Sequence, residues 1–128
     1  MTRRRVLIVE DNLLNLELVS DLLEAAGYEV LQAATAEQGI ETARTGLPDV
    51  ILMDIDLPGM NGLDATKVLR ADAKTRNIPV VALTAFAMAG DEQKAFEAGC
   101  AGYLTKPIDT RKFAAQVSAF IAQKEKTP

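Results

Sequence analysis

Five short apolar runs, each followed by a stretch with helical spacing, limit most strongly what this chain can fold into. The runs are Arg5–Val9, Glu29–Ala33, Val50–Met53, Pro79–Leu83 and Gly102–Thr105. Strands that alternate with helices indicate a parallel sheet covered by helices on both faces. The sequence therefore predicts an α/β fold.

The hydrophobic pattern of the runs also predicts their order in the sheet. Val6–Val9, Val50–Met53 and Val80–Leu83 are apolar throughout. Such strands are buried on both faces and belong in the middle of a sheet. The second and fifth runs carry polar residues, which is typical of edges. The pattern agrees with a flavodoxin-like, doubly wound sheet of five parallel strands in the order 2-1-3-4-5, with five helices.

The first expected helix, capped by Asn12, carries two apolar stripes, and its surface can be interpreted in two ways. The stripes consist of Leu16, Val19, Leu23 and Ala26, and of Leu14, Leu18 and Leu22. A helix packed on a sheet needs only one broad stripe. Either the stripes merge into one wide buried face, or Leu14 and Leu18 stay exposed and dock a partner helix.

Residues able to carry chemistry follow four of the five runs. They are Glu10 and Asp11 after the first run, Asp54 after the third, Thr84 after the fourth and Lys106 after the fifth. In open α/β sheets, ligands bind beyond the carboxyl ends of the strands. We therefore expect three carboxylates, a hydroxyl and an amine to meet at one edge of the sheet.

This combination of groups suits phosphoryl chemistry. Crowded carboxylates repel one another and tend to take up a proton or a cation. The chain has no histidine, so any metal must be held by oxygen atoms. Oxygen ligands favour a hard cation, either Mg²⁺ or Mn²⁺. A hydroxyl and an ammonium can hold a phosphoryl group. A carboxylate can itself be the nucleophile, and Asp54, which ends the central strand, is the expected one.

Each of these residues also has an ordinary structural interpretation. Asp11 could cap the first helix, and Asp54 could begin a turn. Thr84 could be a strand residue, and Lys106 could be a solvated charge. The occurrence of all of them at successive strand ends favours a shared site.

Four segments resemble the response-regulator receiver family of the CheY-like superfamily. They are Val6–Asn12, Ile51–Gly62, Val81–Ala85 and Tyr103–Pro107. The resemblance covers nearly the whole chain, and the combination of motifs is highly specific. It implies a single receiver domain over residues 1–128, with a core over about residues 4–123 and no output domain.

The resemblance implies a role for each acidic residue. Asp54 would be the phosphoacceptor. Asp11 would bind Mg²⁺ directly and Glu10 through water, while the backbone carbonyl of Asp56 would be a further metal ligand. The Asp56 side chain departs slightly from the family pattern, because it adds a negative charge near the site.

The resemblance also implies how the phosphoryl group would be held and sensed. Thr84 and Lys106 would contact it, and Tyr103 would be the aromatic switch. Pro107 would follow Lys106 through a cis peptide bond, a costly feature expected only before proline.

Protein partners follow from the same resemblance. The phosphoryl donor would be a phosphohistidine on a histidine kinase or a histidine phosphotransfer protein. Leu14, Asn15, Leu18 and Ile108 fall where receivers usually meet such a partner. Phosphorylation would change the surface of helix 4, strand 5 and helix 5, where a downstream protein binds. Phe86 could be a core residue, slow the attack of water on the phosphate, or touch a partner.

Three other functions can be weighed against this one. Asp54-Ile55-Asp56 has the look of the Asp-x-Asp motif of haloacid-dehalogenase-type phosphatases, but that motif usually follows the first strand. An EF-hand calcium loop is excluded, since Ala65 stands where the bidentate Glu is needed. A receiver that binds proteins without being phosphorylated is the third. The preferred function is a switch and not an enzyme in the usual sense.

Charge and composition limit the partners and the compartment. The net charge of −4 and the pI of about 4.8 argue against nucleic acid, because phosphate binding needs clustered Lys and Arg. The first apolar run is too short for a signal peptide or a membrane span. Cys100 is the single cysteine and is expected to be a small buried filler. We therefore expect a cytoplasmic protein.

Overall fold

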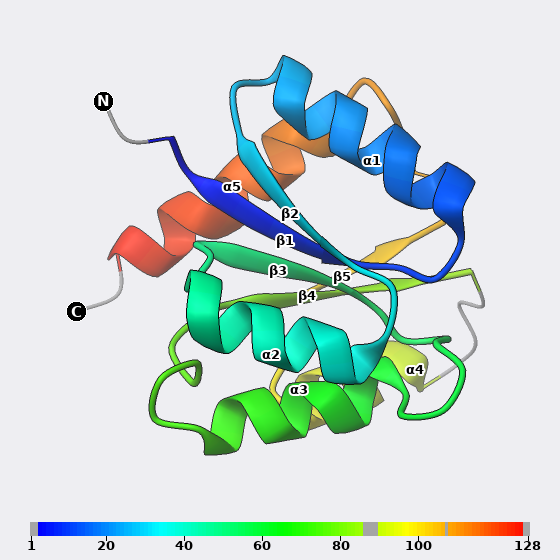
Figure 1. The fold of residues 1–128 in the computed structure, drawn as a ribbon, viewed down its shortest axis with the longest axis vertical. Coiled ribbons are helices and arrows are strands. Elements are labelled where there is room, and N and C mark those ends of the chain that lie inside the picture. Colours follow the sequence, from blue (N-terminus) through cyan, green and yellow to red (C-terminus); the bar gives the residue numbers. More distant parts are fainter. Residues whose placement is uncertain (1–2, 86–89, 107, 127–128) are drawn as a thin grey trace.

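The sheet has the predicted order. The structure, a computed structural model, describes residues 3–85, 90–106 and 108–126. Its parallel strands are arranged in the order β2-β1-β3-β4-β5 (Figure 1). Their bounds are β1 Arg5–Val9, β2 Glu29–Ala33, β3 Val50–Asp54, β4 Val80–Thr84 and β5 Gly102–Thr105. β3 extends one residue further than predicted, and β4 begins and ends one residue later, so that Asp54 and Thr84 are the last residues of their strands.

Helices cover both faces of the sheet (Figure 1). They are α1 Leu13–Ala25, α2 Ala36–Gly46, α3 Gly62–Ala71, α4 Asp91–Glu97 and α5 Phe113–Lys126. One core cluster combines α1 and α5 with Val6 and Ile8 of β1. The other combines α2, α3 and α4 with Leu7 and Val9 of the same strand. Because side chains alternate along a strand, β1 supplies both clusters and is buried from Val6 to Val9.

The predicted distinction between central and edge strands is confirmed. Every residue of β3 and β4 is buried, whereas β2 and β5 each contain exposed and half-buried residues. A strand that is buried on both faces is largely apolar, which is why the composition of the runs distinguished central strands from edge strands.

The structure separates the two apolar stripes of α1. Leu16, Val19 and Leu23 are buried, whereas Leu14 is 78% exposed and Leu18 46% exposed. The stripes therefore do not merge fully: Leu14 and Leu18 stay exposed, whereas Leu22 of the same stripe is half-buried against the core. The expectation that Ala26 belongs to the buried stripe is wrong, since it is exposed at the C-cap of α1. The cap at the other end is as predicted, because Asn12 accepts a hydrogen bond from the Asn15 N–H.

Glycine allows the start of α3 to approach the end of β3. A Cβ atom at Gly62 would lie 2.4 Å from the Asp54 carbonyl oxygen and 2.7 Å from Ile55 Cα. Both neighbours are backbone atoms, so any larger residue would have to displace the chain next to Asp54. This contact fixes the position of the loop that follows β3.

Within the residues that the structure describes, no helix combines the length and the hydrophobicity needed to cross a bilayer.

Candidate functional site

The predicted site residues meet at the carboxyl edge of the sheet. Asp54 and Thr84 end the adjacent strands β3 and β4, while Glu10 directly follows β1 and Lys106 directly follows β5. Parallel strands end at the same edge, so residues far apart in sequence come together there. Glu10, Asp54 and Thr84 are all buried, although each is polar or charged.

Lys106 connects two of the carboxylates. Its ammonium nitrogen Nζ lies 2.6 Å from Glu10 Oε1 and 2.9 Å from Asp54 Oδ2. The other oxygen of Glu10 accepts a hydrogen bond from the Asn12 N–H at 3.3 Å. The other oxygen of Asp54 accepts one from the Asp56 N–H at 2.8 Å. Buried charges must be paired, and each of these carboxylates has one oxygen on Lys106 and the other on a backbone N–H.

The surroundings separate the pKa values of Glu10 and Asp54. Burial raises the pKa of Glu10, the neighbouring Asp54 raises it further, and Lys106 only partly opposes this. Burial also acts to raise the pKa of Asp54, but the Glu10 carboxyl, the Asp56 N–H and Lys106 outweigh it and lower the pKa of Asp54. Of Glu10 and Asp54, it is therefore Asp54 that keeps its negative charge more readily, as a nucleophile must.

Lys106 stays charged in this environment. Burial acts to lower the pKa of Lys106, but its contacts with Glu10 and Asp54 outweigh that effect and raise it. An ammonium that carries its charge at neutral pH can bind a phosphoryl oxygen as well as a carboxylate.

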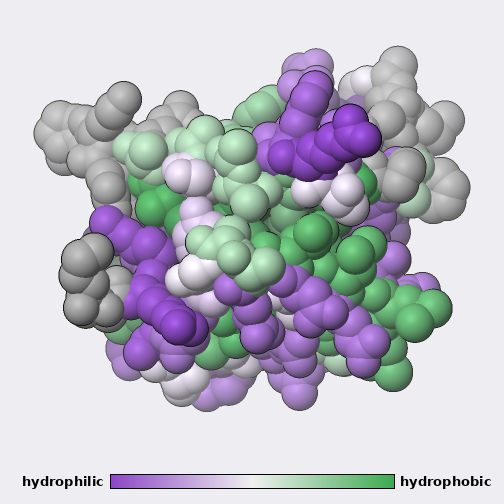
Figure 2. All heavy atoms as spheres, turned by 90° about the horizontal axis from the view of Figure 1, so that it is seen from above, coloured by the Kyte–Doolittle hydropathy of each residue, from purple (hydrophilic) through white to green (hydrophobic). Residues whose placement is uncertain are grey.

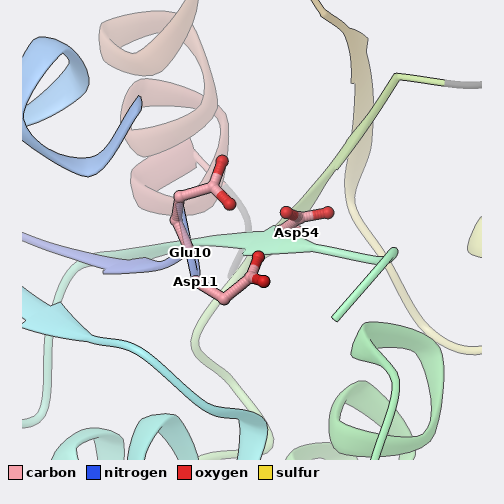
Figure 3. Close-up of side chains that lie close together, drawn as sticks. All are labelled: Glu10, Asp11 and Asp54. Carbon is pink, nitrogen blue, oxygen red and sulfur yellow. The ribbon is translucent and has the colours of Figure 1, made fainter. Parts of the chain in front are cut away.

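Three carboxylates lie close enough together to fit a metal site (Figure 3). One oxygen each of Glu10, Asp11 and Asp54 falls within 4.8 Å of the other two. Opposite ligands of an octahedral Mg²⁺ ion lie about 4.2 Å apart, twice the usual bond length. The spacing therefore suits one small ion, with some of its ligands contacted through water. All the donors are oxygens, which a hard cation prefers.

Asp56 has contacts that sequence reasoning missed. Its backbone N–H donates to Asp54, and its side-chain Oδ2 accepts hydrogen bonds from Thr84 Oγ1 at 3.2 Å and from the Ala85 N–H at 3.3 Å. For the Asp56 side chain, only an added negative charge was expected from the sequence. The short Asp-x-Asp spacing was the available signal, because Asp side chains often bond the backbone two residues on.

The predicted switch residue, Tyr103, is half-buried. It packs against the core cluster formed with α2, α3 and α4. Its hydroxyl group is buried and has no hydrogen-bond partner among the described residues. Burial raises the pKa of Tyr103, and the negative charges of Asp91, Glu92 and Asp56 add to the effect. The phenol therefore stays neutral at physiological pH.

The predicted docking residues differ in exposure. Leu14 and Leu18 are exposed on α1, Asn15 is half-buried, and Ile108 is half-buried against the core cluster of α1 and α5. Leu13, which sequence reasoning missed, is 70% exposed; its place at the first position of the helix was the available signal. Figure 2 shows hydrophobic and hydrophilic side chains side by side on the face formed by α1 and α5. Leu14 and Leu18 are four positions apart and so adjoin on the surface of α1. Grouped exposed apolar side chains are typical of protein-binding surfaces.

Two predicted site residues, Phe86 and Pro107, lie outside the described residues. Cys100 is buried as expected, and burial raises the pKa of its thiol.

The fold and the carboxylate–lysine cluster define a receiver domain. Residues 6–118 match the family of the response regulator receiver domain, so this chain belongs to that family. Members of this family act in phosphorylation-dependent signalling, which is the function class that the sequence predicts.

Individual relatives agree with this assignment. The chain is 45% identical over 118 residues to the polar-differentiation response regulator DivK of Brucella ovis, covering 92% of this chain and 96% of that one. A CheY-like receiver domain protein from Methanospirillum hungatei has a TM-score of 0.91 at 27% identity, covering 99% of this chain and all of the other. The resemblance to CheY-like receivers that the motifs suggested is confirmed.

One structural relative bears on the metal. The receiver domain of the sensor histidine kinase PA1611 from Pseudomonas aeruginosa has a TM-score of 0.87 at 34% identity, covering 94% of this chain and 99% of the other. That structure has a magnesium ion coordinated in its active-site cleft.

Proposed function

We propose that this chain is a phosphorylation switch of a two-component system or phosphorelay, in which Asp54 accepts a phosphoryl group from a phosphohistidine of a partner protein. The contact of Lys106 with Glu10 and Asp54 carries the proposal. It supplies a fixed cation at the carboxylate that would receive the group, and it favours the ionised form of that carboxylate.

The transfer needs one bond to form and one to break. A carboxylate oxygen of Asp54 forms a bond to phosphorus, while the bond from phosphorus to the imidazole nitrogen breaks and its electron pair stays on that nitrogen. Lys106 and the Thr84 hydroxyl would donate hydrogen bonds to the phosphoryl oxygens. The partner supplies the imidazole, and this chain supplies the acceptor and the groups that orient it.

We further propose that the acidic cluster holds Mg²⁺. Asp11, Asp54 and the backbone carbonyl of Asp56 would be ligands, with Glu10 contacting the ion through water. The ion would help to offset the charge of about −1.5 to −2 that a phosphoryl group carries.

The partners are proteins in this proposal. An exposed apolar pair, Leu14 and Leu18, supports docking of a helix from the histidine kinase or phosphotransfer protein beside Asn15 and Ile108. A downstream protein would bind the face formed by α4, β5 and α5, with Tyr103 responding to the phosphoryl group. This signalling would take place in the cytoplasm.

Mass measurement tests the proposal directly. The purified protein is incubated with acetyl phosphate and Mg²⁺, and its intact mass is then recorded. We expect a single base-labile phosphoryl adduct that is absent from Asp54→Asn. An unchanged mass in a folded wild-type protein would instead favour a receiver that binds partners without phosphorylation.

A donor screen tests the source of the phosphoryl group. Radiolabelled histidine kinases and phosphotransfer proteins of the same organism are mixed briefly with the chain. Transfer of label from at least one of them to the wild type, and not to Asp54→Asn, is the expected result. Labelling by acetyl phosphate alone would contradict the proposed donor while leaving Asp54 as the acceptor.

A further inference from the structure

The Asp56 side chain links the loop after β3 to the end of β4. Its Oδ2 atom accepts hydrogen bonds from the Thr84 hydroxyl and from the Ala85 N–H. The backbone of the same residue donates to Asp54 Oδ1. One residue therefore contacts both the carboxylate expected to be phosphorylated and the segment expected to respond to it.

The two donors that Asp56 occupies are suited to an anion. A hydroxyl and a backbone N–H that converge on one carboxylate oxygen can equally well converge on a phosphoryl oxygen, because both acceptors carry negative charge. Thr84 lies at the end of β4, the strand next to Asp54 in the sheet. A phosphoryl group on Asp54 would need donors from this direction.

We propose that the Asp56 carboxylate is an internal competitor of the phosphoryl group, an inference that rests on the proposed function. In the unphosphorylated protein it holds Thr84 and Ala85. On phosphorylation these donors exchange from Asp56 to a phosphoryl oxygen, and the end of β4 moves with them. Asp56 is thus a positioning residue that biases the switch toward its resting state.

The negative charge of Asp56 acts in the same direction. The hydrogen bond from the Asp56 N–H to Asp54 keeps the Asp56 backbone beside Asp54, so its carboxylate stays within a side-chain length of an incoming dianion. Like charges at short range repel, and water screens part of this repulsion because Asp56 is exposed. Removal of this carboxylate should therefore favour the phosphorylated conformation.

Beryllofluoride, which imitates a phosphoryl group on a carboxylate, is the probe for this competition. Its affinity is measured for the wild type, Asp56→Ala and Asp56→Asn at Mg²⁺ concentrations that saturate each protein, because the Asp56 carbonyl is a proposed metal ligand. Loss of these hydrogen bonds from the resting state should tighten binding by about threefold to tenfold in Asp56→Ala, which corresponds to about 0.7–1.4 kcal/mol. Asp56→Asn should fall between the two, since its amide oxygen still accepts hydrogen bonds without the charge.

Asp21→Asn is the matched control for charge. Asp21 is an exposed carboxylate on α1, outside the proposed site, and its variant should bind beryllofluoride as the wild type does. Equal or weaker binding by both Asp56 variants would overturn the inference. If the wild-type protein neither binds beryllofluoride nor forms the Asp54 adduct, the proposed function itself fails.

The Ala85 amide proton, compared between the resting and the beryllofluoride-bound states, distinguishes an exchange of acceptor from a purely structural role of Asp56. In the resting protein its NMR chemical shift should change in Asp56→Ala, because its acceptor is lost. With beryllofluoride bound, wild type and variant should coincide, because the acceptor is then the same group. An Ala85 shift that is identical in the two resting proteins would contradict the proposed hydrogen bond and its exchange.

Discussion

The Lys106 ammonium nitrogen lies 2.9 Å from Asp54 Oδ2, across a sheet in which the two residues stand 52 positions apart. The same nitrogen contacts Glu10, so one cation offsets two buried carboxylates. Lys106 lowers the pKa of both carboxyl groups, and the difference between them comes from the contact of the two carboxyls with each other and from the Asp56 N–H.

Substitution of Lys106 by Met should raise the pKa of Asp54. Burial, which acts to raise that pKa, would remain, while the Lys106 hydrogen bond that lowers it would be lost. Phosphorylation by acetyl phosphate should slow by on the order of 10²-fold, as when a charge-stabilising donor is removed from a reaction site. Carboxyl-carbon NMR titration and the rate of adduct formation measure the two effects. The exposed Lys67→Met on α3 serves as a control, and equal rates in both variants would contradict the role of Lys106.

Glu10 should make stability depend on pH in the metal-free protein. Its pKa is raised on folding, so its contribution to stability is fully present below the unfolded value of about 4.3 and is lost as pH rises through the folded value. The side chain in Glu10→Gln cannot ionise, so the stability of this variant does not fall with the ionisation of residue 10. Its free energy of unfolding relative to wild type should therefore increase between about pH 4.5 and pH 8. Asp54 has a lowered pKa and titrates below this range, so it does not obscure the result. Urea unfolding in the presence of a chelator measures the difference, and a constant difference would show that Glu10 titrates normally.

Gly62→Ala should disturb the site through the backbone. The added Cβ would meet the Asp54 carbonyl oxygen at 2.4 Å, so the end of β3 must shift. We expect a loss of stability of about 1–3 kcal/mol and slower adduct formation at Asp54. Gly46→Ala is the contrasting variant, because its Cβ would meet only the end of the Leu31 side chain, and Ala favours a helix over Gly. Equal behaviour of the two variants in urea unfolding would argue that the close approach at Gly62 has no effect.

Leu14→Glu should separate docking from chemistry. Leu14 is 78% exposed, so its replacement should change stability by less than about 0.5 kcal/mol. Adduct formation with acetyl phosphate should be unchanged, because this donor needs no protein surface. Transfer from a protein phosphohistidine should slow by about tenfold or more, since a charge would enter an apolar contact. Unimpaired transfer from the protein donor would place the docking surface elsewhere.

Much of the fold followed from the sequence because the controlling signals are local. A run such as Val50–Met53 is apolar at every position only when both faces of its strand are buried, and this placed three runs in the centre of the sheet. The site residues followed as well. Parallel strands end at one edge, so Glu10, Asp54, Thr84 and Lys106 could be expected together before any distance was known.

The sequence could not resolve features that depend on how distant segments pack. Whether Leu14 and Leu18 join the buried face of α1 depends on the rotation of that helix on the sheet, and the structure leaves them exposed. The Asp56 side chain was known only as an added charge. Its contact with Thr84, 28 positions away, depends on the path of two loops.

The sequence by itself thus determined which strands lie in the centre of the sheet and which residue types stand at the strand ends, because periodicity and composition record burial along each segment. Only the tertiary structure decided how charge is shared within the site. Burial raises and Lys106 lowers the pKa of both Glu10 and Asp54, whereas the contact between the two carboxyl groups raises the pKa of Glu10 and lowers that of Asp54, which also accepts the Asp56 N–H. These contacts exist only once the strands have assembled.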